Sequence, residues 1–231
     1  MWQYDATYTI KQSMSATIIS FATQKGGSGK TTLLMLTAAA IHCRLKKKVL
    51  VIDSDPQRSV KEIYKQEEHP EAYDVFAFNW QQPSPEVNFE KVLKLAEEKY
   101  DVILMDVPGK GRGKEVFFSI MFSDVLVVPI VASKLDINAT INFLEAVPEI
   151  KERQGGSLEV FGVINKKDGT IEHKGLYDLS GIGGMQLFYS PLSSLVRYKR
   201  YVSTHRDITD PKDPDDEFNR YFDEFCARCY L

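Results

Sequence analysis

Residues 21–32 read FATQKGGSGKTT, and this stretch decides the fold. Gly29, Lys30 and Thr31 match the end of the phosphate-binding pattern G-x-x-x-x-G-K-[ST], but Gln24 stands where that pattern has its first glycine. A second lysine, Lys25, comes directly before the glycines. Glycines let a backbone approach phosphate oxygens closely, and the start of a helix favours negative charge. The stretch therefore predicts a phosphate loop with an additional lysine at its entrance.

The same loop supplies most of the predicted ligand contacts. We expect the Lys30 ammonium to reach the β- and γ-phosphates of a nucleotide and the Thr31 hydroxyl to bind Mg²⁺. The predicted nucleotide contacts in the loop are Lys25, Gly26, Gly27, Ser28, Gly29, Lys30, Thr31 and Thr32. The alternative is a glycine-rich turn without a ligand, which is disfavoured because the loop lies between a predicted strand and a predicted helix.

Short apolar segments alternate with longer helical patterns along the rest of the chain. Strands are predicted at 16–22, 48–55, 73–79, 101–108, 124–130, 158–165 and 185–190. Helices are predicted at about 30–43, 58–68, 87–99, 136–153 and 215–230, with a short helix before residue 124. In the helix at 136–153, Asp136 is a candidate cap and Pro148 a candidate kink or break. This alternation predicts an α/β fold, a doubly wound and mostly parallel sheet with helices on both faces.

Carboxylates follow two of the predicted strands. VLVIDSDPQ places Asp53 and Asp55 at the end of the second strand, and VILMDVPG places Asp106 at the end of another. Ligands of such sheets bind at the carboxyl ends of the strands, so a carboxylate there is suited to holding Mg²⁺-bound water. The alternative is that Asp53 or Asp106 only ends its strand in a turn.

Composition and charge exclude several classes of protein. The 231 residues are 43% hydrophobic and 26% charged with a net charge of −3, which is typical of a globular protein without general affinity for polyanions. No apolar run is long enough to span a bilayer, and the first residues lack the apolar core of a signal peptide. The three cysteines are too few for a disulfide scaffold and favour a reducing compartment. We expect a cytoplasmic protein with an N-terminal extension at 1–15 and a single domain at 16–231.

In combination, KGGSGKTT, DSDPQ and DVPG resemble the ParA/MinD family of deviant Walker A ATPases, and within it the ParA partition ATPases that lack a helix-turn-helix domain. The resemblance extends over nearly the whole chain. It implies an ATP-sandwich homodimer in which Lys25 reaches the nucleotide of the partner. It also implies slow, partner-stimulated, Mg²⁺-dependent ATP hydrolysis, with Lys25, Lys30 and Asp55 as catalytic residues. Asp55 would be linked to the attacking water, while Asp53 and Asp106 would hold the Mg²⁺ shell through water.

Two weaker similarities imply where the base and DNA bind. Asn165 in GVINKKD stands where the family reads adenine, and LFYSPLSSLVRYKRY, which contains Pro191, resembles the family's segment beside the base. This segment leads into the region with which ParA dimers hold double-stranded DNA without sequence preference, which implies DNA contacts from Arg197, Lys199 and Arg200. The alternative for these residues is a solvated helix face. The resemblance further implies a ParB-like or small DNA-binding adaptor and association with the nucleoid.

The wider family suggests other interpretations. A MinD-like or adaptor ATPase would position a protein cargo without binding DNA, although the acidic start of the last segment, DPDDEFNRYFDEFCARCYL, disfavours membrane binding. Cys226 and Cys229 have C-x-x-C spacing but close a predicted helix, so we expect idle thiols and not a metal site. A second basic segment, from Arg44 to Lys48, is interpreted as an exposed turn. The aromatic residues predicted to pack in the core from the last helix are Phe218, Tyr221, Phe222 and Phe225. A plasmid, a chromosome or a conjugative element would suit this sequence equally well as cargo.

Overall fold

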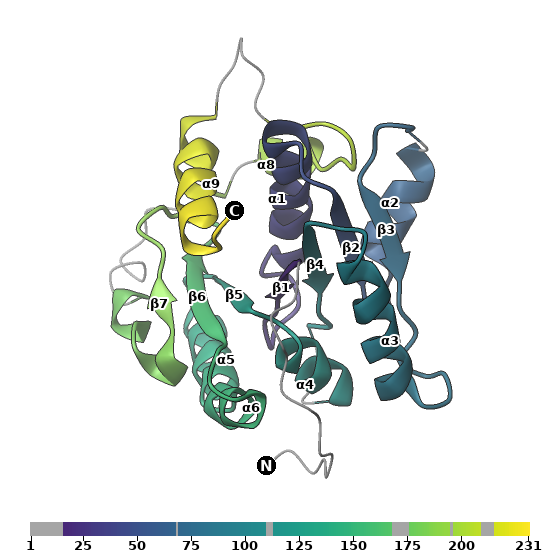
Figure 1. The fold of residues 1–231 in the computed structure, drawn as a ribbon. Helices are drawn as coiled ribbons and strands as arrows, with labels where there is room; N and C mark the ends of the chain where they lie inside the picture. Colours follow the sequence, from purple (N-terminus) through teal and green to yellow (C-terminus); the bar gives the residue numbers. More distant parts are fainter. Residues whose placement is uncertain (1–15, 68, 110–112, 168–175, 195, 209–214) are drawn as a thin grey trace.

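A parallel sheet forms the centre of the protein (Figure 1). The computed structural model describes residues 16–67, 69–109, 113–167, 176–194, 196–208 and 215–231, so the extension predicted at 1–15 lies outside the described residues. Within these ranges the sheet has seven strands in the order β3-β2-β4-β1-β5-β6-β7, and all neighbours are parallel. The strands are β1 (Thr17–Phe21), β2 (Val49–Asp53), β3 (Asp74–Ala77), β4 (Val102–Asp106), β5 (Val125–Ile130), β6 (Glu159–Ile164) and β7 (Gln186–Leu187). The predicted doubly wound parallel fold is confirmed.

The inner strands are buried on both sides. Every residue of β2, β4 and β5 is buried, and strands covered on both faces are near-continuous apolar runs, such as VILMD in β4. The two edge strands are weaker. β3 exposes Asp74 and Phe76, and β7 has two residues where the sequence predicts a strand at 185–190. An edge strand has a single neighbour, which explains why apolar composition alone overestimates its length.

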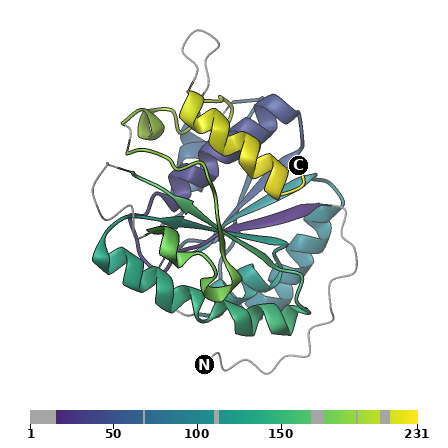
Figure 2. The ribbon, with the colours of Figure 1, turned by 90° about the vertical axis from the view of Figure 1, so that its left-hand side faces the viewer.

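Helices form a layer on each face of the sheet (Figure 2). One layer contains α1 (Lys30–Leu45), α2 (Ser59–Glu67), the short α8 (Val196–Arg200) and α9 (Asp216–Arg228). The other contains α3 (Pro85–Glu97), α4 (Lys114–Met121), α5 (Lys134–Leu144) and α6 (Val147–Gln154). Two 3₁₀ turns, η1 (Leu176–Leu179) and η2 (Ile182–Gly184), precede β7. Each layer packs its own apolar cluster against the strands, so the sheet separates the core into two halves. No helix in the described ranges is long and apolar enough to cross a membrane.

Two helix starts differ from the sequence prediction. The helix expected at 136–153 begins earlier, because Ser133 is its N-cap and its hydroxyl accepts a hydrogen bond from the Asp136 N–H at 3.2 Å. The prediction that Asp136 caps this helix is therefore wrong, and Asp136 lies in the first turn. The break expected at Pro148 is confirmed, because α5 ends before it and α6 begins beside it. α3 begins at Pro85, before the predicted start at residue 87, because proline suits the first helical position.

The last helix, α9, packs on the sheet as predicted. Its buried aromatic residues are Phe218, Tyr221, Phe222 and Phe225. The sequence suggested that Arg44 lies in an exposed turn, and this prediction is wrong, because Arg44 belongs to α1. Its guanidinium lies over the rings of Phe218 and Phe222 and donates from Nη2 to Asp207 at 2.9 Å.

The two C-terminal cysteines lie at the end of α9. Cys229 is buried, and burial raises the pKa of the Cys226 thiol to about 11. Burial also raises the pKa of Cys229. Both thiols are thus protonated near neutrality and poor nucleophiles. Among the residues that the structure describes, no group of histidine, cysteine, aspartate and glutamate could hold a metal ion by itself.

Candidate nucleotide-binding site

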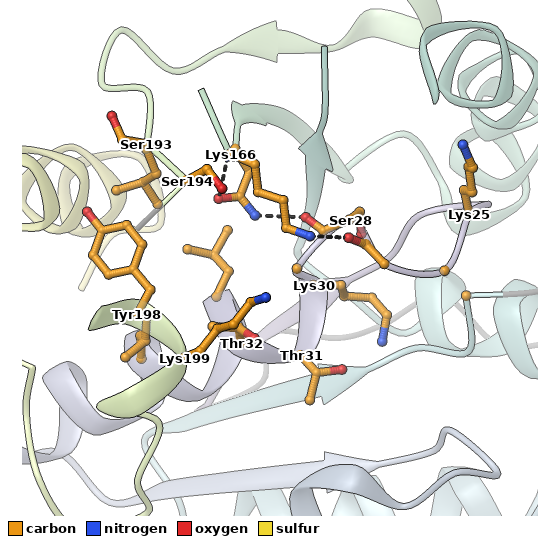
Figure 3. Close-up of a pocket in the computed structure, with 18 of the residues that line it drawn as sticks. Lys25, Ser28, Lys30, Thr31, Thr32, Lys166, Ser193, Ser194, Tyr198 and Lys199 are labelled. Carbon is orange, nitrogen blue, oxygen red and sulfur yellow. Dashed lines mark hydrogen bonds between the residues drawn. The ribbon is translucent and has the colours of Figure 1, made fainter. Parts of the chain in front are cut away.

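The loop at 22–29 joins the central strand β1 to α1 at the carboxyl end of the sheet. It forms one wall of a cavity of about 320 Å³ (Figure 3). Other walls come from Gly109 after β4, from Asn165 after β6, and from residues 192–194 and α8. Ligands of parallel α/β sheets bind at this edge. The fold therefore places the predicted phosphate loop inside a cavity large enough for a small molecule.

The backbone of the loop depends on glycine at two positions. Gly27 and Gly29 both have a φ of 85°, in the left-handed region that strains other residues. A side chain at Gly29 would also collide with Asn165, because its Cβ would lie 2.6 Å from the Asn165 Nδ2. This Nδ2 donates a hydrogen bond to the carbonyl oxygen of Ser28 at 2.8 Å. Asn165 thus fastens the loop to the end of β6.

Lys30 and Thr31 both contact Asp106 at the end of β4. The Lys30 ammonium forms an ion pair with one carboxylate oxygen of Asp106, and both side chains are buried. The Thr31 hydroxyl donates to the other oxygen at 2.8 Å. The structure therefore brings together the loop lysine, the hydroxyl expected to bind Mg²⁺ and one of the expected carboxylates. Without a nucleotide, Asp106 compensates the buried charge of Lys30.

Asp53 is fully buried beside Asp106, its partner in the register of β2 and β4. Its Oδ2 accepts a hydrogen bond from the Lys61 N–H at 3.0 Å, but its Oδ1 has no hydrogen-bond partner among the described residues. Burial raises the pKa of Asp53 to about 6, although the Lys61 hydrogen bond acts in the other direction. Hard cations such as Mg²⁺ prefer carboxylate, hydroxyl and water oxygens. The unpartnered oxygen of Asp53, together with Asp106 and Thr31, therefore fits a Mg²⁺ shell.

Asp55 lines the cavity on the loop that follows β2. Its Oδ1 accepts a hydrogen bond from the Gln57 N–H at 2.9 Å, and its carbonyl oxygen accepts one from the Arg58 N–H at 2.9 Å. Both hydrogen bonds belong to the local turn, and they fix the direction of the carboxylate. Its other oxygen has no hydrogen bond to a described residue. Asp55 can thus accept a hydrogen bond from water in the cavity.

Lys25 lies on the far side of the site from the other lysines (Figure 3). Its ammonium forms a 2.6 Å ion pair with Asp136 in the first turn of α5, and both side chains are partly exposed. Partial burial would raise the pKa of Asp136, but hydrogen bonds from Lys25 and Ser133 outweigh it and hold this pKa below its usual value. Lys25 therefore points away from Lys30 and is held within its own chain.

Lys166 lines the cavity, although sequence reasoning did not identify it. It follows Asn165, has a left-handed backbone with a φ of 58°, and donates from its ammonium to the carbonyl oxygen of Gly27. The only signal in GVINKKD is a lysine next to Asn165, and such a lysine is ordinary on a protein surface. Lys166 and Asn165 thus hold neighbouring carbonyl oxygens of the loop from the same strand end.

The wall facing α1 is built by the segment after β7. Glu217 of α9 holds this segment, because it accepts hydrogen bonds from the N–H and hydroxyl of Ser193 at 3.1 and 2.9 Å and lies 3.3 Å from the Tyr198 hydroxyl. The apolar side chains of the cavity are Leu192 in this wall and Leu33 and Leu36 of α1. An apolar wall with a few polar groups suits a nucleoside base. Pro191, predicted beside the base, does not line the cavity, whereas the next residue does.

The three residues predicted to bind DNA all lie on α8. Lys199 and Arg200 are both exposed, and Lys199 also lines the nucleotide cavity. The side chain of Arg197 lies outside the part of the chain that the structure describes. The DNA contacts therefore stay a prediction, and Arg200 is the exposed member of the set that does not line the cavity.

The parallel sheet, the loop and the strand-end carboxylates define a P-loop nucleoside triphosphatase fold. The family model for the CobQ/CobB/MinD/ParA nucleotide binding domain matches residues 19–179. The chain belongs to this family, which confirms the resemblance to ParA and MinD ATPases drawn from its motifs. A comparison with curated protein sequences gives no match.

Several solved structures share the fold. A plasmid partition protein of Borrelia burgdorferi B31 bound to AMPPNP is 18% identical with a TM-score of 0.69, over 92% of this chain and 99% of that one. An ATP complex of McdA from Cyanothece is 18% identical with a TM-score of 0.72, over 95% and 98% of the two chains. MinD of Aquifex aeolicus is 18% identical with a TM-score of 0.66, over 94% and 98%. At this level of identity the likeness concerns the fold alone.

Proposed function

We propose that the chain is a ParA-like, Mg²⁺-dependent ATPase that forms an ATP-bound homodimer, binds double-stranded DNA without sequence preference and uses hydrolysis to position a DNA cargo. One observation carries the proposal, namely the opposite directions of the two loop lysines. Lys30 lies in the cavity against Asp106, whereas Lys25 points away and pairs with Asp136. Lys30 thus serves its own site, and Lys25 can serve a second one once its ion pair with Asp136 is broken. The AMPPNP and ATP bound to the partition protein and to McdA support ATP as the ligand.

ATP binding replaces the ion pair between Lys30 and Asp106. Lys30 exchanges Asp106 for the β- and γ-phosphates, and the N–H groups at the start of α1 bind phosphate oxygens. Asp106 and Thr31, together with Asp53, would then hold Mg²⁺, which would supply positive charge to neutralise the phosphates. Asp55 orients the attacking water by accepting a hydrogen bond from it. No covalent intermediate is required, so positioning and charge stabilisation supply the rate enhancement.

Lys25 completes the active site of a second copy of the chain. Phosphoryl transfer is accelerated by a cation that reaches the γ-phosphate from outside the loop. No arginine is found among the described residues that line the cavity, so the chain supplies no arginine finger from this part of itself. For Lys25 to reach the partner, its ion pair with Asp136 has to break. Loss of the γ-phosphate removes the contact, and the dimer dissociates.

DNA binding is assigned to the outer face of α8, where Arg200 is exposed. Stimulation of a slow basal rate by a ParB-like or small DNA-binding adaptor would make the ATPase a timer for a plasmid, a chromosome or a conjugative element. A MinD-like or adaptor ATPase that positions a protein cargo is the second candidate. One observation favours it, because Lys199, one of the three predicted DNA contacts, also lines the nucleotide cavity.

Phosphate release and light scattering test the proposal together. Lys30→Ala should lose productive ATP binding, and Asp55→Ala should bind ATP, hydrolyse it slowly and accumulate as a dimer. Adding Lys25→Ala to the Asp55→Ala protein should return a monomer. Lys65→Ala, on the exposed side of α2, is the matched lysine control and should behave as wild type. A monomeric Asp55→Ala protein at saturating ATP and Mg²⁺ would contradict the dimer. Absence of phosphate release under every condition, DNA included, would contradict the ATPase.

A further inference from the structure

Lys199, the lysine of α8, is exposed and lines the nucleotide cavity. Tyr198, from the same helix, lies beside it in the cavity wall. Figure 3 places Lys199 on the side of the cavity away from Lys25. No hydrogen bond or ion pair joins Lys199 to another described residue. Asp55 is the one carboxylate among the described residues that line the cavity. The Lys199 ammonium therefore faces a cavity that favours an anion.

The orientation of α8 is fixed by α9. Tyr198 is 6% exposed, packs on Phe218 with ring centres 6.4 Å apart, and its hydroxyl lies 3.3 Å from Glu217. Consecutive side chains of an α-helix point about 100° apart, so the side chains of residues 199 and 200 leave α8 in different directions. With Tyr198 fixed in the core, both cations are exposed, but only Lys199 lines the cavity.

We propose that Lys199 binds the nucleotide at its ribose and α-phosphate end and is not a DNA contact. This inference rests on the proposed nucleotide binding. Lys30 and the loop hold the β- and γ-phosphates at one end of the cavity, and Leu33 and Leu36 of α1 form the apolar end. Thr32 lies between these ends on the first turn of α1, and Lys199 lines the same cavity from α8, which packs against α1. The negative charge of a nucleotide at that point belongs to its α-phosphate.

The proposed contact between Lys199 and the α-phosphate should be the same before and after hydrolysis, because hydrolysis leaves the α-phosphate unchanged. ATP, ADP and AMP share this group, so Lys199→Ala should weaken the binding of all three by the same factor. An exposed charged contact corresponds to a loss of about 3- to 10-fold in affinity. Uniform loss of binding raises KM and leaves kcat unchanged. Lys199→Arg should retain most of the affinity, because it keeps the charge.

Measurements of DNA binding at two ATP concentrations distinguish a nucleotide contact by Lys199 from a direct contact with DNA. Lys199→Ala should bind duplex DNA like wild type when ATP is well above the Kd of the variant. At limiting ATP it should bind less DNA, because less of the protein carries nucleotide. Arg200→Glu should lose DNA binding at both ATP concentrations and keep its nucleotide affinity. An assay at a single low ATP concentration would mistake Lys199 for a DNA contact.

Titration with fluorescent ADP and AMPPNP, and with AMP as competitor, tests the inference, alongside gel shifts at two ATP concentrations. Lys65→Ala, on the exposed side of α2, is the matched lysine control and should keep wild-type affinity for the three nucleotides. Thermal melts verify that each variant is folded. Wild-type nucleotide affinity in Lys199→Ala would overturn the inference, and so would a DNA defect that saturating ATP does not restore. Failure of the wild-type protein to bind any nucleotide would refute the proposed function instead.

Discussion

The buried carboxylate of Asp53 opposes folding when it is charged. Burial raises its pKa to about 6 from an ordinary 3.8. The folded state therefore binds a proton more tightly than the unfolded state, and the free energy of unfolding falls as the pH rises between these values. A difference of this size corresponds to a loss of about 3 kcal/mol at neutral pH. Such a penalty is reasonable at a site where Mg²⁺ compensates the charge.

Asp53→Asn should therefore stabilise the nucleotide-free and Mg²⁺-free protein at pH 7.5. The expected gain is about 1–3 kcal/mol, part of it offset because the new amide also needs partners. At pH 5 the gain should shrink, because wild-type Asp53 is then mostly protonated. Melting curves in EDTA at both pH values measure the effect. Asp55→Asn, on the same edge of the sheet but partly exposed, is the control. An equal shift of the melting temperature at both pH values would show that burial of charge is not the cause.

The ion pair between Lys25 and Asp136 opposes formation of the proposed dimer, because it has to break before Lys25 can reach the partner. Because both side chains are partly exposed, the pair contributes about 0.2–1 kcal/mol. Asp136→Asn should therefore lower the ATP concentration needed for dimerisation by up to about 5-fold. Light scattering across an ATP titration, in the Asp55→Ala background, measures this. Glu149→Gln breaks a comparable pair with Arg153 on α6 and should change nothing. Weaker dimerisation in Asp136→Asn would mean that Asp136 positions Lys25 for its partner.

At the scale of elements, α9 supports the cavity through two glutamates with different targets. Glu217 holds Ser193 and Tyr198 in the cavity wall. Glu224 accepts hydrogen bonds from the N–H groups of Tyr189 and Ser190, both at 2.9 Å, and these residues do not line the cavity. Glu217 and Glu224 both attach α9 to the segment after β7, but only Glu217 contacts residues that line the nucleotide cavity.

Replacing either glutamate by alanine should lower the free energy of unfolding by about 1–3 kcal/mol, since each loses several hydrogen bonds. Glu217→Ala should in addition weaken ADP and ATP binding, because the cavity wall loses its support. Denaturant unfolding and nucleotide titration of the two variants give the comparison, in which Glu224→Ala is the control. Equal nucleotide affinity in the two variants would mean that the wall holds its shape without α9.

The sequence predicts those parts of the site that are local. The loop and the aspartates at strand ends are recognisable because glycine, lysine and carboxylates follow predicted strands directly. Lys166 and Lys199 were not assigned to the cavity, because their contacts join distant parts of the chain. The hydrogen bond from Lys166 to Gly27, for example, spans 139 positions. α8 has five residues, too few for a helical period to appear in sequence. Ser133 was missed as a cap because the apolar pattern begins after it.

At the scale of the whole molecule, the nucleotide cavity joins the beginning and the end of the chain. The phosphate loop follows the first strand, whereas α8 and the loop before it arrive after the last one. Both parts meet on the same side of the sheet, where α1, α8 and α9 form one layer (Figure 2). The surface proposed for DNA is therefore carried by a wall of the nucleotide cavity. A dimer would carry two such surfaces.

DNA binding should consequently depend on ATP and on two copies of α8. One copy offers few phosphate contacts, and joining two copies on one duplex increases affinity by effective concentration alone. The affinity should fall with salt by ~0.9 log units per log unit of salt for each phosphate contacted. Arg200→Glu should abolish binding and keep ATP-driven dimerisation, whereas Lys91→Glu makes the same change of charge on the exposed side of α3, in the other layer, and should bind normally. Gel shifts with unrelated duplexes, with ADP and with ATP at two salt concentrations, measure these effects. Equal binding with ADP and ATP, or normal binding by Arg200→Glu, would exclude this surface and favour the protein-cargo alternative, because the switch would then act elsewhere.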